Sequence, residues 1–243
     1  MADALADRRA AAGTRRWPEG TFLHALGEDD QKRLLGLGTQ RTYPPGAPLI
    51  EEGAADTDVF VLLDGYGKVL GNTVDGRVVL LSVRGKGDVV GELAALDRKR
   101  RSASVLALTT VVARVVSRGA FVGFLHDRTS AADALQATML SEFRRVTRHR
   151  LLVSGASVEV RLVLLLDYLI DVYGQRCADG VRIAVPLSQP EVASMIGVAE
   201  PSLHRALARL RERNVIGTGH RRLTVRDPEA LRALAADARA TQA

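Results

Sequence analysis

The chain has 243 residues, of which 47% are hydrophobic, so it is long enough for two domains that each bury a core. Its net charge of +6 favours a polyanionic partner. The single cysteine, Cys177, excludes a disulfide framework and any four-cysteine metal or iron–sulfur site within one chain. The longest apolar run, around residues 158–170, is interrupted by Glu159, Arg161 and Asp167, so no membrane-spanning segment is expected.

The N-terminal segment has the composition of a tail. Residues 1–16 are rich in Ala, Arg and Asp and lack the apolar stretch of a secretory signal. We expect residues 1–19 to be a disordered tail, and the protein to be cytoplasmic. Residues 22–38 then show the spacing of two short amphipathic helices.

Short β-rich runs follow from Gln40 onward. Turn residues separate them, and Asp75-Gly76 between two valine-rich runs is a strong hairpin signal. Short strands at regular spacing predict a sandwich or small barrel over residues 20–130. The expected strands are Pro48–Glu51, Val59–Leu63, Lys68–Asn72, Arg77–Val83, Ser104–Ala107 and Val111–Val116.

A candidate ligand site lies between two of these strands, in residues 89–105. Gly91 lets the backbone approach a ligand closely, and Glu92–Leu96 can form one helical turn whose N–H groups face an anion. Arg101 can neutralise that anion, Ser102 adds a hydroxyl, and Glu92 can accept from a sugar hydroxyl. This combination predicts a site for a sugar cyclic phosphate. The alternative is a purely structural Glu92–Arg101 salt bridge.

Beyond Gly119 the chain becomes helical. Apolar residues recur along residues 131–157 in a narrow stripe, which a second subunit could cover as in a two-stranded coiled coil. Packing on the β domain is the alternative. The stripe consists of Leu135, Met139, Phe143, Val146 and Val153, and Ser154 and Gly155 mark a hinge after it.

The C-terminal region, residues 158–243, has the pattern of a winged helix–turn–helix. We expect a helix at Val158–Tyr173, a polar loop through Asp179-Gly180 and a strand at Val181–Pro186. Two amphipathic helices joined at Gly197-Val198 follow in residues 188–216, with Pro201 in the first turn of the second. A two-stranded wing and a closing helix are expected at Val215–Thr218, Arg222–Val225 and Pro228–Arg239.

The second helix of this motif can read DNA. Residues 199–226 hold seven arginines against two acids, which is the electrostatic footprint of a polyanion-binding surface. Arg205 can take guanine O6 and N7, and Glu200 can accept from a cytosine amine. The other candidates are Ser202, Arg221 and Arg222 for phosphates, His204 on the same face, and Arg209 for DNA or a salt bridge.

These motifs resemble the Crp/Fnr family of transcription regulators over roughly residues 20–235. The resemblance is carried by Gly46, Glu51-Glu52-Gly53, Asp64-Gly65 with Lys68-Val69, GELAAL with RSASV, the long helix and residues 188–216. It implies an α+β fold: a jelly-roll-like cyclic-nucleotide-binding β-roll, a long dimerisation helix and a C-terminal winged helix–turn–helix. It also implies a homodimer on a palindromic operator of double-stranded DNA, associated with the nucleoid, with RNA polymerase as a further partner.

The resemblance also implies roles for individual residues. In the family the glutamate binds the ribose 2′-hydroxyl, and the arginine and the hydroxyl residue bind the cyclic phosphate. The matching positions here are Gly91, Glu92, Leu93, Arg101 and Ser102. Two adjacent hydroxyl residues on the long helix reach the adenine in cyclic-AMP-binding members. Here they are Val146 and Thr147, so one hydroxyl is lost.

Cyclic AMP is the first ligand to expect, with two alternatives. Lys99-Arg100 adds charge beside Arg101 and could attract a cyclic dinucleotide, or the chain could be an orphan member that binds DNA constitutively. Of the Arg-Glu-x-x-x-Arg arrangement with which cyclic-AMP-binding members read DNA, only Arg205 survives, so a different operator is expected.

Other chemistries find little support in the sequence. The histidines form no HExxH motif and do not pair with Cys177, and Gly85–Gly91 resembles a dinucleotide fingerprint only loosely. The N-terminal cysteine cluster of the family's oxygen sensors is absent. We therefore expect no enzyme activity, no metal and no cofactor other than the effector.

Overall fold

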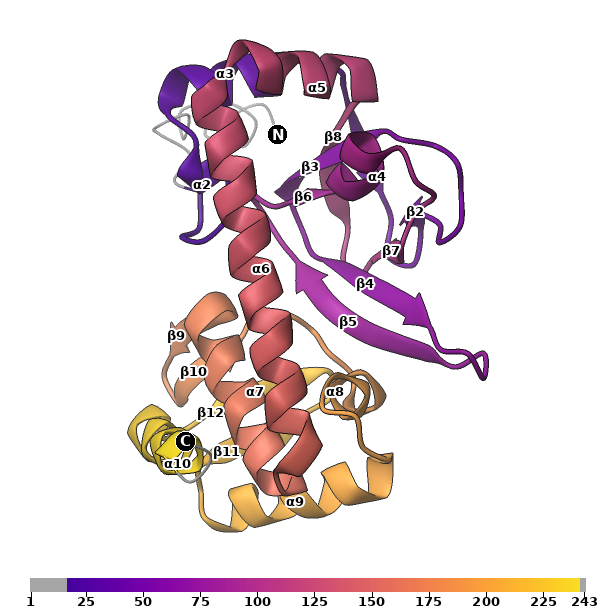
Figure 1. Ribbon diagram of the computed structural model, residues 1–243. Helices are drawn as coiled ribbons and strands as arrows, with labels where there is room; N and C mark the ends of the chain where they lie inside the picture. The colour runs from indigo at the N-terminus through magenta and orange to yellow at the C-terminus, as the bar shows by residue number, and fades with distance from the viewer. Residues whose placement is uncertain (1–16, 241–243) are drawn as a thin grey trace, which may run out of the picture.

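The computed structural model describes residues 17–240, without the side chains of residues 145 and 148–154. A β-rich domain forms the upper part of the molecule in Figure 1, and a mostly helical domain forms the lower part. The helix α6 (Thr129–Gly155) runs from one to the other. The architecture is α+β, as expected from the sequence.

The segment before the first sheet is part of the folded domain. Phe22 and Leu34 are buried in the helices α2 (Phe22–Ala25) and α3 (Glu28–Gly36). The predicted disordered tail over residues 1–19 extends too far, because Trp17 is 4% exposed and its Nε1 donates to Oε1 of Gln31 at 3.1 Å. Residues 1–16 lie outside the described residues.

Two four-stranded antiparallel sheets form the β-roll. The first has the order β1-β8-β3-β6 and the second β2-β7-β4-β5. The strands of the first sheet are β1 (Thr39–Tyr43), β8 (Val111–Val116), β3 (Val59–Asp64) and β6 (Val89–Val90). Those of the second are β2 (Pro48–Ile50), β7 (Ser104–Ala107), β4 (Gly67–Asn72) and β5 (Val78–Arg84).

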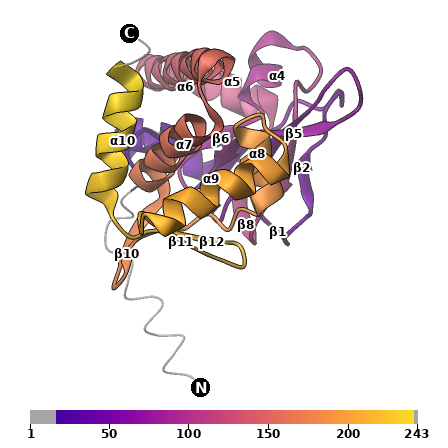
Figure 2. The same ribbon diagram turned by 90° about the horizontal axis from the view of Figure 1, so that it is seen from below.

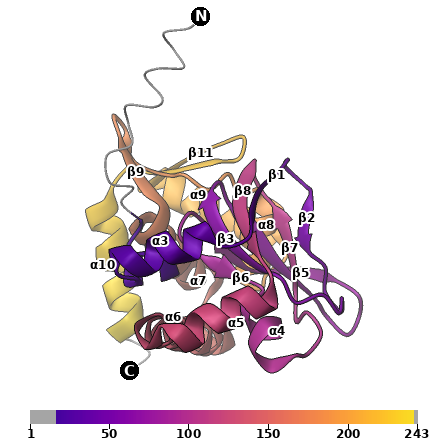
Figure 3. The same cartoon turned by 90° about the horizontal axis from the view of Figure 1, so that it is seen from above.

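Strand β3 shows how the sequence builds this domain. Its run of five apolar residues is buried on both faces. Phe60 and Leu62 belong to the cluster between the sheets, whereas Val59, Val61 and Leu63 belong to a second cluster with the helices. That second cluster includes α5 (Arg118–Asp127), which lies with α3 across the upper end of the molecule (Figures 1 and 3).

The long helix α6 divides the predicted apolar stripe between two environments. Leu135 is 2% exposed and packs with Met139 on the N-terminal domain, which is the alternative considered for the stripe. Phe143 and Val146, one to two turns later, are 70% and 53% exposed. The Val153 side chain lies outside the described residues. The second half of the helix therefore presents apolar side chains to solvent within one chain.

The C-terminal domain is built around α7 (Val158–Tyr173), whose Leu162, Leu166 and Leu169 are fully buried. A four-stranded antiparallel sheet has the order β11-β12-β10-β9, and β9 (Gly174–Cys177) replaces part of the expected loop. The predicted strand at 181–186 is shorter, ending at Ile183. The remaining elements are β10 (Gly180–Ile183), α8 (Gln189–Met195), α9 (Glu200–Glu212), β11 (Ile216–Gly219), β12 (Arg222–Val225) and α10 (Pro228–Ala240).

The two domains contact each other through the hairpin of β4 and β5, which Figure 1 shows above α8. The backbone N–H of Leu80 donates to Oγ of Ser194 in α8 at 2.8 Å. Nζ of Lys68 lies 3.0 Å from Oε1 of Glu191, also in α8. Leu80 belongs to the same buried cluster as the core of the C-terminal domain. The first helix of the helix–turn–helix is therefore docked on the β-roll.

No helix within residues 17–240 is both long and apolar enough to cross a membrane.

Candidate functional site

A cavity lies in the N-terminal domain between the end of β5, β6, the short helix α4 (Glu92–Asp97) and β7. Its empty volume, including open solvent at the mouth, is about 520 Å³. It is lined by Ile50, Val69, Arg84, Val89, Val90, Gly91, Glu92, Leu93, Ala94, Arg101, Ser102, Ala103 and Val105. The five ligand residues predicted from residues 89–105, here called the cassette residues, therefore lie together: Gly91, Glu92, Leu93, Arg101 and Ser102.

Gly91 is required at this position for two reasons. Its φ is +85°, a backbone conformation that residues with a Cβ rarely adopt. A Cβ there would also lie 2.6 Å from Nη1 of Arg101 and 2.8 Å from the carbonyl oxygen of Asp58. The glycine thus lets the arginine pass close to the backbone at the start of α4.

Arg101 is the buried cation of the cavity, with 3% of its surface exposed. Its Nη1 donates to the carbonyl oxygen of Gly91 at 2.9 Å, and Nη2 donates to that of Asp58 at 2.6 Å. Its Nε donates to Oδ1 of Asp56 at 3.1 Å, and Nη2 pairs with the same oxygen. The predicted alternative of a Glu92–Arg101 salt bridge is wrong, because the partner is Asp56 on the β2–β3 loop.

Glu92 begins α4 and is one of the residues that line the cavity. Burial raises the pKa of this carboxyl, although a backbone hydrogen bond and the positive charge of Arg84 act in the opposite direction. Nη2 of Arg84 donates to Oε2 of Glu142 on α6 at 2.8 Å. The cavity wall therefore contains charged groups of both signs.

Leu93, Ser102 and Thr147 are more exposed than Arg101. Leu93 is 45% exposed, and Ser102 is exposed at the cavity mouth. Thr147 is exposed on α6 and is not among the residues that line the cavity. A single chain therefore does not bring Thr147 to the other predicted ligand residues.

Sequence reasoning missed Asp56 and Arg84. Asp56 lies 45 residues before Arg101 on a loop without a local motif. Arg84 was only the residue after a predicted strand, although a charged residue ending an apolar run was a weak signal.

The second candidate surface is the helix α9. Leu203, Leu207 and Leu210 bury one stripe, with 0–2% of their surfaces exposed, and leave the opposite face free. Figure 2, the view from below, shows α9 at the surface with β11 and β12 beside it. The predicted DNA contacts on this helix, Glu200, His204, Arg205 and Arg209, are exposed, and Ser202 is partly exposed.

Two arginines of α9 have different partners. Nη2 of Arg205 donates to Oγ of Ser202 at 3.2 Å, within the predicted DNA-binding face. Nη1 of Arg209 lies 3.3 Å from Oε2 of Glu159, in the first turn of α7, and Arg213 reaches the other oxygen at 3.4 Å. The structure thus places Arg209 in the salt bridge that the sequence left open.

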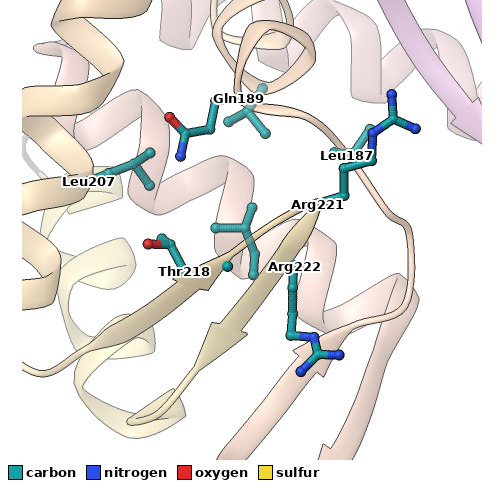
Figure 4. Close-up of a pocket in the computed structure, with 9 residues that line it drawn as sticks. Leu187, Gln189, Leu207, Thr218, Arg221 and Arg222 are labelled. Carbon is teal, nitrogen blue, oxygen red and sulfur yellow. The ribbon is translucent and has the colours of Figure 1, made fainter.

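The wing lies beside α9, with Arg221 at a φ of +47° in the β11–β12 turn. Figure 4 shows a small cavity between the wing and the helix–turn–helix, where Gln189, Leu207 and Thr218 come from three elements. The guanidinium groups of Arg221 and Arg222 extend in opposite directions. Both arginines are exposed, as phosphate contacts require.

Among the described residues, no cluster of three or more His, Cys, Asp or Glu side chains could hold a metal ion.

The two domains of the chain each match a known domain model, and related proteins match most of its length. Residues 40–128 match the cyclic nucleotide-binding domain model, and residues 160–234 match the Crp-like helix-turn-helix domain model. The CRP-like cAMP-activated global transcriptional regulator of Mycobacterium tuberculosis is 25% identical over 189 residues, covering 78% of this chain and 84% of that protein.

Solved structures show the same fold. FixK2 from Bradyrhizobium japonicum has a TM-score of 0.70 and 21% identity, with 82% of this chain and 97% of that chain covered. The c-di-GMP responsive global regulator CLP of Xanthomonas campestris has a TM-score of 0.71 and 17% identity, with 82% and 99% covered.

The two domain models together span more than half of the chain, one on the β-roll and one on the winged helix–turn–helix. The chain therefore belongs to the Crp/Fnr family, as a DNA-binding transcription regulator with a cyclic nucleotide-binding domain.

Proposed function

We propose that this protein is a homodimeric transcription regulator whose operator affinity is controlled by a cyclic nucleotide, with cyclic AMP as the first candidate. The observation that carries this proposal is the buried Arg101, which lines the cavity and donates to the carbonyl oxygen of Gly91. A buried guanidinium beside a cavity is suited to an anion, because its donors are fixed before the ligand arrives. The name of the Mycobacterium tuberculosis relative supports cyclic AMP.

The cassette residues then have distinct roles in ligand binding. Arg101 and Ser102 bind the cyclic phosphate, and Glu92 accepts from the ribose 2′-hydroxyl. Gly91 allows the close approach, while Leu93 covers the sugar at the cavity mouth. Thr147 contacts the base from α6, and its exposure in a single chain agrees with a contact that forms only at the subunit interface.

Dimerisation through α6 completes this site. Leu140, Phe143 and Val146 are 49%, 70% and 53% exposed, and they recur every three residues along one helix. A second copy of the same helix would bury them in a symmetric interface. Light scattering after size exclusion tests this, and a monomer at micromolar concentration would contradict it.

The DNA-binding surface is α9 with the wing. Arg205 reads a guanine and Glu200 a cytosine amine, whereas Ser202, Arg221 and Arg222 hold phosphates and His204 lies on the same face. Arg209 keeps α9 in place through Glu159. The regulator acts on the nucleoid in the cytoplasm and contacts RNA polymerase there.

Control of DNA binding is a population shift. The ligand favours one geometry of the dimer interface, and rotation about residues 153–157 sets the two α9 helices about one DNA turn, roughly 34 Å, apart. Without ligand the helices are misplaced and specific affinity is lower.

Calorimetric titration with cyclic AMP, cyclic GMP and cyclic di-GMP tests the effector role, with Arg101→Ala as the matched variant. We expect micromolar or tighter binding of one ligand, lost in the variant.

Two alternatives to cyclic AMP control are each supported by particular observations. The exposed Lys99 and Arg100 and the name of the Xanthomonas campestris neighbour favour cyclic di-GMP as the alternative ligand. The Asp56–Arg101 pair favours the other alternative, a constitutive regulator, because Arg101 is satisfied without ligand. Absence of binding to all three ligands would support it.

A further inference from the structure

The cavity contains a second arginine to which no role has been assigned. Arg84, the last residue of β5, lines the cavity together with Glu92 and Arg101. Its side chain is 21% exposed, and its Nη2 donates to Oε2 of Glu142 at 2.8 Å. Glu142 belongs to α6, the helix that connects the two domains. One side chain therefore joins the cavity wall to that helix.

The surroundings of Arg84 keep its guanidinium positively charged. Burial alone would lower its pKa, but the hydrogen bond and the negative charge of Glu142 outweigh burial, so the net shift is upward. The charges of Asp88 and Glu92 act in the same direction. The guanidinium is thus a permanent cation between a cavity carboxylate and a carboxylate of α6. A guanidinium carries more N–H donors than the one that Glu142 accepts, and a ligand acceptor can take another.

The strand that carries Arg84 also contacts the DNA-binding domain. The carbonyl oxygen of Val83 accepts from the hydroxyl of Tyr173, at the end of α7, at 3.0 Å. Four residues before Arg84, the N–H of Leu80 bonds to Ser194 of α8. A shift of Arg84 along β5 would therefore reach α8 and α7 through the hydrogen bonds that the β5 backbone makes with the side chains of Ser194 and Tyr173, without passing through the hinge.

We propose that Arg84 is a positioning residue that transmits occupancy of the cavity to α6 and to the docked helix–turn–helix. An acceptor atom of the bound nucleotide near Glu92 takes donors of Arg84 that Glu142 does not use. The ligand, Arg84 and Glu142 then form one bridge, which restricts α6 and β5 to one arrangement. Arg101 supplies affinity for the phosphate, whereas Arg84 supplies the coupling. This rests on the proposed effector function.

The test uses the full chain with Arg84→Met, which keeps the apolar stem and removes the donors. Glu142→Gln removes the charge on α6 and leaves the cavity wall intact. Arg77→Met is the matched control, since Arg77 lies at the end of the same hairpin, with an 82% exposed side chain paired to Asp75. Calorimetry gives the affinity for cyclic AMP, cyclic GMP and cyclic di-GMP. Backbone hydrogen exchange gives the response of residues 89–94, 138–147 and 189–195.

In the wild-type protein and Arg77→Met, we expect the bound nucleotide to slow exchange in the cavity segment and to change it in α6 and α8. In Arg84→Met and Glu142→Gln, affinity should stay within about tenfold, while the change in α6 and α8 falls by more than half. A side chain that only stabilises the fold would lower the Tm without separating these two readouts.

The outcomes distinguish the two proposals. If the wild-type chain binds a nucleotide and both variants keep the full α6 and α8 response, Arg84 does not transmit occupancy, and the effector function stands. If both variants lose ligand binding as Arg101→Ala does, Arg84 is part of the binding site only. If the wild-type chain binds none of the three probes, the effector function fails and the role of Arg84 fails with it. If Arg84→Met does not fold, Glu142→Gln decides.

Discussion

The arginines of the cavity and those of α9 and the wing differ in how their N–H donors are held. Arg101 is 3% exposed, and its donors are held by Asp56 and by two backbone carbonyls. Arg205, Arg221 and Arg222 are exposed, and Arg205 makes one long hydrogen bond to Ser202. Fixed donors suit a single small anion of one shape, whereas mobile donors suit a polyanion that is approached in many registers.

Replacing a buried arginine should destabilise the folded protein much more than replacing an exposed one. Arg101→Ala removes the donors to the carboxylate of Asp56 and to the carbonyl oxygen of Asp58, and leaves the carbonyl oxygen of Gly91 with the N–H of Ala95 at 3.3 Å. We expect the ligand-free protein to lose about 3 kcal/mol of unfolding free energy. Arg205→Ala should change it by less than about 0.5 kcal/mol. Urea denaturation of both variants measures this, and equal losses would remove the distinction.

Gly91→Ala tests whether the cavity wall requires a glycine at this position. The positive φ and the close approach of Arg101 Nη1 together should cost about 1–3 kcal/mol of stability and displace the guanidinium. Gly46→Ala is the matched control, because Gly46 has the same φ of +85° with nothing within 4 Å of its Cβ position. It should cost only about 1 kcal/mol. Equal costs at the two sites would show that the close contacts of a Cβ with Arg101 and with the carbonyl oxygen of Asp58 are unimportant.

The exposed arginines are tested on DNA. Arg205→Ala should lower affinity for a selected operator by about 1–3 kcal/mol and relax the preference at one base pair. Arg221→Ala should weaken binding uniformly across sequences and reduce the salt slope by about one. Fluorescence anisotropy with an operator series at several salt concentrations separates the two. Sequence-independent loss in both variants would contradict base reading by Arg205.

The smallest effect concerns the contact between the domains. Burial alone would raise the pKa of Glu191, but hydrogen bonds from Ser188 and Lys68 outweigh it, so the pKa is lowered from its ordinary value of 4.5. The stabilisation is therefore present above pH 4.5 and is lost as pH falls through the lowered pKa in the folded state. Lys68→Met should flatten this part of the pH profile of the Tm. Because the pair is partly exposed, the effect is modest, and an unchanged profile would contradict the contact.

Much of the fold could be predicted because its signals are local. Alternation and turn residues located most strands of the β-roll, and helical spacing located α7, α8, α9 and α10. Three strands were missed. β6 is apolar but has only two residues, Val89 and Val90. β1 and β9 carry little apolar pattern, since the residues of β1 are almost all exposed and those of β9 are all exposed. They are held by hydrogen bonds to neighbouring strands, which their own sequence does not reveal.

The sequence by itself determined the cassette around Gly91 and Arg101 and the two helices of the helix–turn–helix, because glycine at positive φ and apolar residues at helical spacing are local requirements. Only the tertiary structure decided that Asp56 holds Arg101, that Arg84 joins the cavity to Glu142, and that Glu159 holds Arg209. Each of these pairs joins residues 45 to 58 positions apart in the chain. Such charge pairs form where the fold brings two segments together, and no local periodicity specifies which carboxylate an arginine will meet.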